Sequence, residues 1–402
     1  MRFSYGFDPY KTIYEIKFKK YVIEFLKNLK PELFSKAPYE FLEKYDNYYV
    51  ELENYKDVKN VIVCGTGANA LYMDVMKKFT KKNLIILDSP SPYIIDEIFK
   101  LKDEETAIIY ISRSGDTLEV ISAYHLLHRK FKNNIILANK GKLKLLALEN
   151  KDKIIDIRTD LSGRYMFATN IVSIPCYLLG INFKELLMYA IQSMDIFFKY
   201  NIEQIKDIDT NNFNQKLKEI DNPALNMAIS IYYFLEYEKV DNIWVTTYDD
   251  YLADLPNAFN QLVNESTGKD GSRLLLFHKN SPRAQHELIQ RVNGGLKNIF
   301  PIILTTKESL IDFKYLEGTG LKDKSVNEIL NIEADATMKA YQKLNIPYIN
   351  IALDKPTLKE VVKTFMLSQC LAYYLSKLLK VNAFDNPDVD LGKKYALELL
   401  HN

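Results

Sequence analysis

Short apolar runs alternate with helix-like segments along residues 61–157, and this alternation restricts the possible fold more than any other feature. The runs have the length of buried strands and lie at residues 61–64, 84–87, 107–111, 134–138 and 154–157. Between them, apolar residues recur at helical spacing. Strands that are connected through helices form a parallel sheet with helices on both faces. The sequence therefore predicts an α/β fold.

A second set of such runs follows, at residues 243–246, 273–276, 299–304 and 348–351. The 402 residues are enough for two or three domains. We therefore expect two doubly wound α/β/α domains in tandem, although no direct sequence repeat links them, with a helical segment at each end. The predicted boundaries are 1–55 (N-terminal helices), 56–200 (first domain), 201–355 (second domain) and 356–402 (C-terminal helices).

Charge and cysteine content exclude several classes of protein. Lys+Arg total 53 and Asp+Glu 52, so nothing overall favours nucleic acid or an acidic membrane as a partner. The three cysteines are far apart and form neither a metal-binding spacing nor an even disulfide set. No apolar stretch resembles a signal peptide or reaches the length of a membrane span. We expect a cytoplasmic protein.

The stretch from Ile108 to Leu127 combines a strand, a polar loop and a helix. The loop Ser112–Thr117 contains three hydroxyl side chains and one glycine. Unpaired N–H groups at the start of a helix favour an anion, so the loop could hold a phosphate without a dedicated cation. The alternative is an ordinary turn in which Ser114 or Asp116 caps the helix.

A second loop, Gly65–Asn69, follows the first strand and begins like a dinucleotide-binding motif. The third glycine position of that motif is Ala70, although Asp88 could serve as the ribose-binding acid. We therefore do not predict nicotinamide binding. Both loops follow the carboxyl ends of strands, where ligands of parallel sheets bind, so they are expected to face one pocket.

Arg164 is a further candidate, because it follows Ser162-Gly163 at the entry to an apolar helix. An arginine in this position can reach an anion in a pocket beside the sheet. The alternative is a surface arginine that pairs with Asp160.

Five ordered motifs resemble those of the phosphoglucose isomerase family, which is built from two sugar-isomerase (SIS) domains. The resemblance covers about residues 58 to 396. The motifs are the loop 112–119, Gly163-Arg164-Tyr165, Gln261-Leu262 with Glu265-Ser266 and Gly268-Lys269, Gln285-His286 with Gln290, and Asn386-Pro387 with Val389–Lys393. The resemblance implies interconversion of glucose 6-phosphate and fructose 6-phosphate in glycolysis and gluconeogenesis.

Isomerisation requires a base that moves one proton between two carbons through an enediol. A partly buried carboxylate suits this role, and the resemblance assigns it to Glu265. It further implies that Gln261 orients the substrate hydroxyls and that Arg164 stabilises the enediolate. Opening of the sugar ring needs an acid–base pair, which the resemblance assigns to His286 and Lys393.

The resemblance also defines the phosphate site and the assembly. It implies that Ser112, Ser114, Thr117 and the backbone N–H of Arg113 bind the phosphate, together with Gly67 and Asn69 of the first loop. It implies no cofactor and no metal. His125 and His128 have a spacing that two ligands could use, but without an evident third ligand we expect a structural helix face. The family is generally dimeric, and its catalytic histidine comes from the neighbouring subunit, so we expect a homodimer.

The sequence departs from the family pattern at several positions. Asn69 replaces the serine that contacts phosphate in the first loop, although its amide can still donate a hydrogen bond. Asp390 replaces a glutamate near Lys393. The other departures are Met166, Ala284 and Glu287. Two alternatives stay open: a non-catalytic regulator that binds sugar phosphates, and an SIS enzyme with another or a dual substrate, such as mannose 6-phosphate or an amino sugar phosphate.

Overall fold

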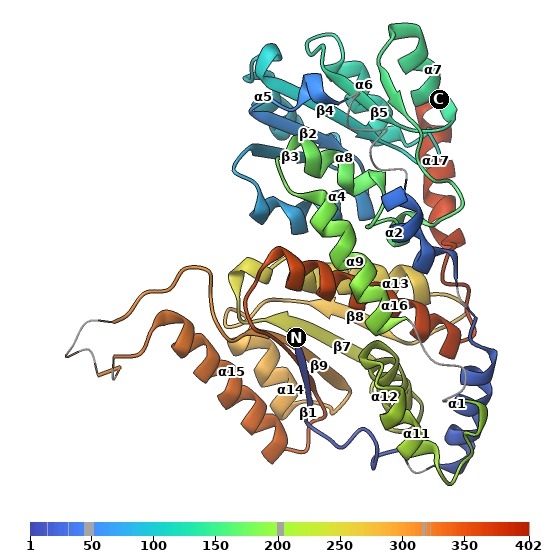
Figure 1. Ribbon diagram of the computed structural model, residues 1–402, viewed down its shortest axis with the longest axis vertical. Helices are drawn as coiled ribbons and strands as arrows, with labels where there is room; N and C mark the ends of the chain where they lie inside the picture. Colours follow the sequence, from blue (N-terminus) through green and yellow to red (C-terminus); the bar gives the residue numbers. More distant parts are fainter. Residues whose placement is uncertain are drawn as a thin grey trace. The chain divides into compact units, whose positions relative to one another are not determined.

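The computed structural model describes the chain except residues 14, 31, 44–51, 199–204, 316, 317, 319, 322 and 402. The chain forms two compact units (Figure 1). The first unit is Pro31–Gln192, and the second unit combines Met1–Lys30 with Ser193–Asn402. The domain boundary predicted at residues 200 and 201 lies outside the described residues.

The sheet of the first unit has five parallel strands in the order β3-β2-β4-β5-β6. The strands are β2 (Asn60–Cys64), β3 (Asn83–Leu87), β4 (Thr106–Ile111), β5 (Asn134–Leu137) and β6 (Lys153–Ile155). They confirm all five predicted strands of this half. Their almost continuous apolar sequence agrees with strands that are covered on both faces.

Helices cover both faces of this sheet (Figure 1). One face carries α5 (Pro92–Phe99), α6 (Leu118–Leu127) and α7 (Gly141–Asn150). The other face carries α4 (Ala68–Met76) and α8 (Asn170–Leu178), and the unit also contains α2 (Leu33–Glu43) and most of α9 (Phe183–Phe197). Ile108 and Tyr110, alternate residues of β4, pack in one core cluster with Tyr124 of α6. Burial of each such side chain contributes about 1.5–3 kcal/mol.

The sheet of the second unit has the order β1-β10-β9-β7-β8. Four parallel strands confirm the prediction: β7 (Asn242–Thr247), β8 (Leu275–His278), β9 (Ile299–Thr306) and β10 (Ile349–Leu353). The prediction of helices throughout residues 1–55 is wrong at the start, because Arg2–Tyr5 forms strand β1, antiparallel to β10. Four alternating residues at an edge are too short a pattern for periodicity to identify.

Helices also cover both faces of the second sheet. Figure 1 shows α13 (Leu255–Thr267) and α16 (Leu358–Leu378) on one face, with α14 (Gln290–Gly294) and α15 (Val326–Lys343) on the other. In the described part of the chain, the remaining helices of eight or more residues are α1 (Ile16–Asn28), α11 (Phe213–Ile220), α12 (Pro223–Tyr237) and α17 (Asp390–His401). Apart from β1, the strands follow the same spatial order as in the first unit. The prediction of two similar α/β/α halves is therefore confirmed.

Candidate functional site

The two loops predicted to bind phosphate flank one position in the sheet of the first unit. Strand β2 lies between β3 and β4, so the chain direction across the sheet reverses between β2 and β4. Ligands of open α/β sheets bind at this kind of switch point, beyond the carboxyl ends of the strands. Gly65–Asn69 follows β2 and Ser112–Thr117 follows β4, and Cys64 pairs with Tyr110 in the register of the two strands. The structure therefore brings the two loops to one sheet edge.

Hydroxyl groups organise the loop Ser112–Thr117. The buried Ser112 Oγ accepts a hydrogen bond from the Gly115 N–H at 3.0 Å and lies 2.8 Å from Thr117 Oγ1. Ser114 Oγ lies 3.5 Å from Ser112 Oγ and accepts the N–H of Asp116 at 3.2 Å. The three hydroxyls predicted to bind phosphate are therefore clustered at the start of α6.

Neither Ser114 nor Asp116 caps α6. The N-cap of this helix is Thr117, and its side chain accepts no capping hydrogen bond. The first N–H groups of an α-helix have no acceptor within the helix, so they are available to a ligand. The alternative interpretation, in which Ser114 or Asp116 caps this helix, is therefore wrong.

Asp116 instead caps the neighbouring helix α7. Its carboxylate accepts the N–H of Lys142 at 2.9 Å, and the carbonyl of Gly115 accepts the N–H of Leu143 at 2.9 Å. The α7 N-cap residue, Lys140, contributes no side-chain hydrogen bond. The loop after β4 thus supplies the acceptors that α7 lacks.

Two glycines allow this close approach. Gly115 and Gly141 both have positive φ, at +76° and +77°. A Cβ on Gly115 would lie 1.7 Å from the carbonyl oxygen of Lys140, and one on Gly141 would lie 2.6 Å from that of Ser114. Only glycine fits such contacts. Gly141 was absent from the sequence prediction, although a chain with 14 glycines makes each one informative.

The first loop contributes Gly67 and Asn69. Gly67 is exposed and has a φ of +60° at the start of α4. Asn69 lies close to Gly65, and its Oδ1 is buried without a hydrogen-bond partner among the described residues. Asn69 therefore places an amide at the switch point.

Arg164 lies in the short 3-10 helix η4 (Gly163–Tyr165) of the first unit and is only 2% exposed. The alternative of a surface arginine paired with Asp160 is wrong, because Asp160 binds Arg158 at 2.9 and 2.6 Å. The neighbouring carbonyl of Gly163 accepts a hydrogen bond from Tyr72 at 2.6 Å. A side-chain nitrogen of Arg113 donates to the carbonyl of Leu161 at 2.9 Å. This contact joins the phosphate loop to the segment that carries Arg164.

Gln261 and Glu265 are one helical turn apart on α13 of the second unit. Gln261 Nε2 donates to Glu265 Oε1 at 2.8 Å, and both side chains are half-buried. Asn264, which the sequence did not single out, donates to the carbonyl of Leu276 at 2.8 Å and accepts its N–H at 2.9 Å. The side chain of Asn264 thus pairs with the edge strand β8. This contact fixes the rotation of α13 about its own axis at the residue next to Glu265.

His286 and Lys393, the predicted ring-opening pair, are both exposed in the second unit. His286 lies in the π-helix η6 (Gln285–Ile289), and Lys393 lies on α17 with its amine 3.3 Å from Asp390. Asp390 therefore makes an ion pair with Lys393, which belongs to the same motif. The exposure of both side chains is compatible with a site completed by a second subunit.

His125 and His128 lie at the end of α6. His128 stacks on Tyr124, and its Nε2 lies 3.4 Å from Asp152, a carboxylate distant in sequence. Tyr124 also donates a hydrogen bond to Asp152 at 2.5 Å. Among the described residues, no group of three His, Cys, Asp or Glu side chains could hold a metal ion.

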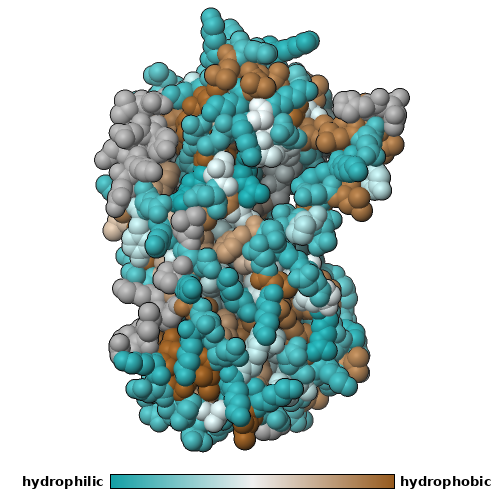
Figure 2. Space-filling view, turned by 90° about the vertical axis from the view of Figure 1, so that its right-hand side faces the viewer, coloured by the Kyte–Doolittle hydropathy of each residue, from teal (hydrophilic) through white to brown (hydrophobic). Residues whose placement is uncertain are grey.

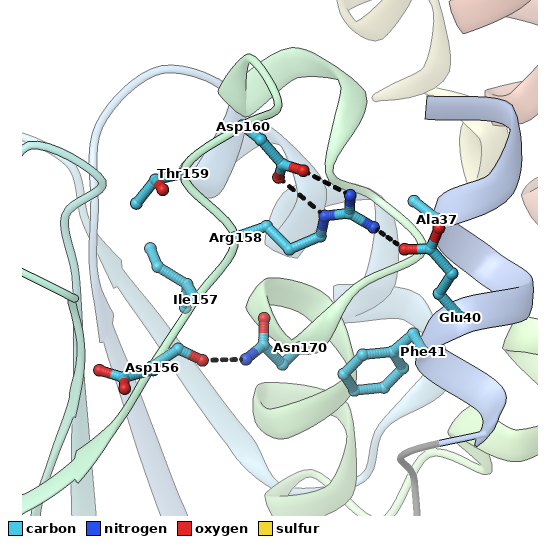
Figure 3. A pocket seen from close by; sticks show the side chains of 9 residues that line it. All are labelled: Ala37, Glu40, Phe41, Asp156, Ile157, Arg158, Thr159, Asp160 and Asn170. Atoms are coloured by element: carbon cyan, nitrogen blue, oxygen red, sulfur yellow. Dashed lines mark hydrogen bonds and ion pairs between the residues drawn. The ribbon is translucent and has the colours of Figure 1, made fainter. Parts of the chain in front are cut away.

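A cavity of about 400 Å³ opens elsewhere in the first unit, between α2, the segment 156–160 and the start of α8 (Figure 3). Arg158 forms ion pairs there with Asp160 and Glu40. Asn170 donates to the carbonyl of Asp156 at 2.7 Å, and its buried Oδ1 has no partner among the described residues. The residues that line this cavity include none of those predicted from the sequence.

Fold and loop geometry together define an α/β protein with two doubly wound sheets and a candidate anion site at a switch point. The solved structure of a glucose-6-phosphate isomerase from Chlamydia trachomatis has this fold, with a TM-score of 0.75 and 14% identity over 99% of this chain and 88% of that one. No model of a known protein family matches the chain.

Two sequence relatives show which enzymes this chain resembles. The glucose-6-phosphate isomerase of Methanocaldococcus jannaschii is 26% identical over 396 residues, which cover 91% of this chain and 94% of the relative. That of Mycoplasmopsis synoviae is 28% identical over 377 residues, or 85% and 83% of the two chains. These relatives confirm the resemblance to the phosphoglucose isomerase family that the motifs indicated.

Proposed function

We propose that this chain is an aldose–ketose isomerase that interconverts glucose 6-phosphate and fructose 6-phosphate. The observation that carries the proposal is the Gln261–Glu265 pair on α13, in a chain similar to glucose-6-phosphate isomerases over about nine tenths of its length. A carboxylate with one oxygen held by an amide keeps a defined orientation, as a base needs when it moves a proton between C2 and C1.

Each candidate residue has a role in the proposed reaction. The phosphate binds to the hydroxyls of Ser112, Ser114 and Thr117, to the N–H of Arg113, and to the N–H groups at the start of α6. His286 and Lys393 open the sugar ring by proton transfer at the ring oxygen. Glu265 then removes the C2 proton and returns it to C1. Arg164 stabilises the enediolate oxygen during this transfer.

We further propose that the protein is a homodimer, with His286 entering the partner's site. On α17, Leu391, Tyr395 and Leu399 recur at four-residue spacing and are all more than half exposed. Figure 2 shows one face of the molecule, on which hydrophobic residues form patches among hydrophilic ones. Exposed apolar groups of this kind favour burial against a second chain. The sedimentation of the purified protein tests this assembly.

We expect the enzyme to act in the cytoplasm, since the three cysteines are buried and unpaired. The absence of disulfides among them is typical of a reducing compartment. None of the helices in the described ranges combines the length and the apolar composition needed to cross a bilayer.

The decisive experiment measures formation of glucose 6-phosphate from fructose 6-phosphate with a coupled dehydrogenase, in the presence of a chelator. We expect turnover, and Glu265→Gln should reduce it about 10²–10⁴-fold while sugar phosphate still raises the melting temperature. Glu219→Gln, an exposed substitution on α11, is the control. Binding of sugar phosphate without turnover in the wild type would favour the alternative of a non-catalytic regulator. Faster turnover of mannose 6-phosphate than of fructose 6-phosphate would favour the alternative of an isomerase with another substrate.

A further inference from the structure

Lys269 lies two residues beyond the end of α13. It belongs to the same motif as Gln261 and Glu265, but the proposed reaction gives it no role. The residue is only 8% exposed. Its amine donates hydrogen bonds to Asp385 Oδ1 at 2.6 Å, to the carbonyl of Asp385 at 2.5 Å and to the carbonyl of Asn382. An ammonium group has three donors, and all three have acceptors here.

Two of these three acceptors are backbone carbonyls, so the amine determines the path of the main chain at residues 382–385. The turn is also closed internally. Asn382 Nδ2 donates to Asp385 Oδ2 at 2.8 Å, and the N–H of Phe384 donates to Asn382 Oδ1 at 3.0 Å. A buried ammonium that loses its acceptors is strongly unfavourable, so the lysine and the turn hold each other in place.

This turn lies between α16, which precedes it in the chain, and α17, which follows it. On one side, α16 packs against α13, and Ser376 Oγ lies 3.2 Å from the carbonyl oxygen of Ser266. On the other side, the turn leads through η7 (Pro387–Val389) directly into α17, which carries Lys393. Lys269 is therefore attached to the helix of Glu265 and to the starting point of the helix of Lys393.

We propose that Lys269 is a positioning residue for the isomerase reaction. It holds the turn 382–385 against the end of α13, and thereby sets where α17 begins and where Lys393 lies relative to Glu265. This role rests on the proposed function, and specifically on ring opening by Lys393. A displacement of a catalytic group by about 1 Å can reduce a rate by about 100-fold, so a defined starting point for α17 matters to the reaction.

The kinetic test compares Lys269→Met with Asp385→Asn and with the control Lys216→Met on α11. Lys269→Met loses all three hydrogen bonds and should reduce turnover of cyclic fructose 6-phosphate by up to about 100-fold. Asp385→Asn keeps an acceptor oxygen and both carbonyl contacts, so its loss should be smaller. Lys216→Met should leave turnover unchanged.

A binding measurement separates positioning from general damage to the fold. The probe is 5-phosphoarabinonate, an open-chain acid phosphate that mimics the enediolate and needs no ring opening. Its affinity should be unchanged in Lys269→Met, because the phosphate loop and Glu265 remain. Loss of turnover together with an equal loss of probe affinity would overturn the positioning role, and so would unchanged turnover.

Hydrogen–deuterium exchange tests the contact itself, whether or not the wild type is an isomerase. In Lys269→Met, exchange should rise in residues 382–401 and stay unchanged in β7 and β9. If Lys269→Met does not fold, Asp385→Asn carries the same test with a smaller expected rise. Unchanged exchange in residues 382–401 would overturn the proposal. Absence of turnover in the wild type would contradict the proposed function instead.

Discussion

The phosphate loop of the first unit and helix α13 of the second unit hold their candidate residues in different ways. In the loop Ser112–Thr117, hydroxyls bind one another and the backbone, and two glycines pack main chain against main chain. On α13, side chains at helical spacing bind each other and the neighbouring strand β8. Backbone contacts thus fix the shape of the loop, whereas side-chain contacts fix the candidate residues on the helix.

This difference follows from what each region binds. A phosphate has the same shape and charge in every step of the proposed reaction, so a rigid backbone cradle can serve throughout. Glu265 must accept and return a proton, so it needs a side chain with a defined orientation. Substitutions in the loop should therefore change shape and substrate affinity, whereas those on α13 should change the rate.

The largest expected effect on stability is that of Gly115→Ala. The new methyl group would lie 1.7 Å from the Lys140 carbonyl oxygen, in a residue with a φ of +76°. We expect a loss of about 1–3 kcal/mol from overpacking and a further 1–2 kcal/mol from the backbone conformation. The KM for sugar phosphate should rise, because the loop must move. Urea unfolding and steady-state kinetics measure the two effects.

Gly180→Ala is the matched control for this substitution. Gly180 also lies in the first unit with a φ of +72°, but a Cβ there would meet no atom within 4 Å. It should lose only the conformational part, about 1–2 kcal/mol, with an unchanged KM. Equal losses of stability in the two variants would show that contact with the α7 loop does not shape the phosphate loop.

A smaller effect is expected for Asn264→Leu, which tests how α13 is held. This substitution removes both hydrogen bonds to Leu276 on the edge strand β8. Each net hydrogen bond contributes about 0.5–1.5 kcal/mol, so we expect a loss of about 1–3 kcal/mol in the free energy of unfolding. The rate should fall more than the affinity for sugar phosphate, because Glu265 is adjacent.

Asn260→Leu, one turn earlier, provides the comparison for Asn264. Within the described part of the chain, Asn260 makes one side-chain hydrogen bond, to His278 at 3.0 Å, so the loss of stability in Asn260→Leu should be smaller. A fall in affinity rather than in rate for Asn264→Leu would contradict the distinction between the two regions.

These residues also show how far the sequence alone can predict this molecule. Nine strands were predicted because buried parallel strands are nearly continuous apolar runs, whereas β1 depends on a partner, β10, that lies far away in the chain. The motifs predict roles for Glu265 and Ser112, because those motifs are local in the sequence. Asp116, Gly141 and Asn264 act through contacts with other segments, so their roles appear only when the chain is folded.

Ser112→Ala should have a still smaller effect on stability, and it tests whether the loop acts on the phosphate. The hydroxyl accepts the Gly115 N–H at 3.0 Å and lies 2.8 Å from the Thr117 hydroxyl. Its removal should cost about 1 kcal/mol of stability and raise the KM with little change in kcat. Thr117→Ser keeps its hydroxyl and serves as the control. A fall in kcat at constant KM would mean that Ser112 acts on the reacting carbons rather than on the phosphate.

The smallest expected effect concerns a charged contact outside both regions, between Arg158 and Asp160. The hydrogen bonds from Arg158 hold the pKa of Asp160 below its usual value. Because the folded pKa is lower than the unfolded one, the unfolded chain binds more protons, and the contact stabilises the fold above the unfolded pKa of about 3.9. This stabilisation is lost as the pH falls through the folded pKa.

Asp160→Asn measures this contribution. The side chain of Asp160 is half exposed, so the wild type should exceed the variant by only about 0–1 kcal/mol at pH 7. In urea unfolding, the difference should shrink toward zero as the pH falls through the folded pKa, since below it the carboxylate is protonated in both states. High salt at pH 7 should reduce it as well. A difference that grew as the pH fell would mean that a neutral hydrogen bond, and not the charge of Asp160, holds the segment leading to Arg164.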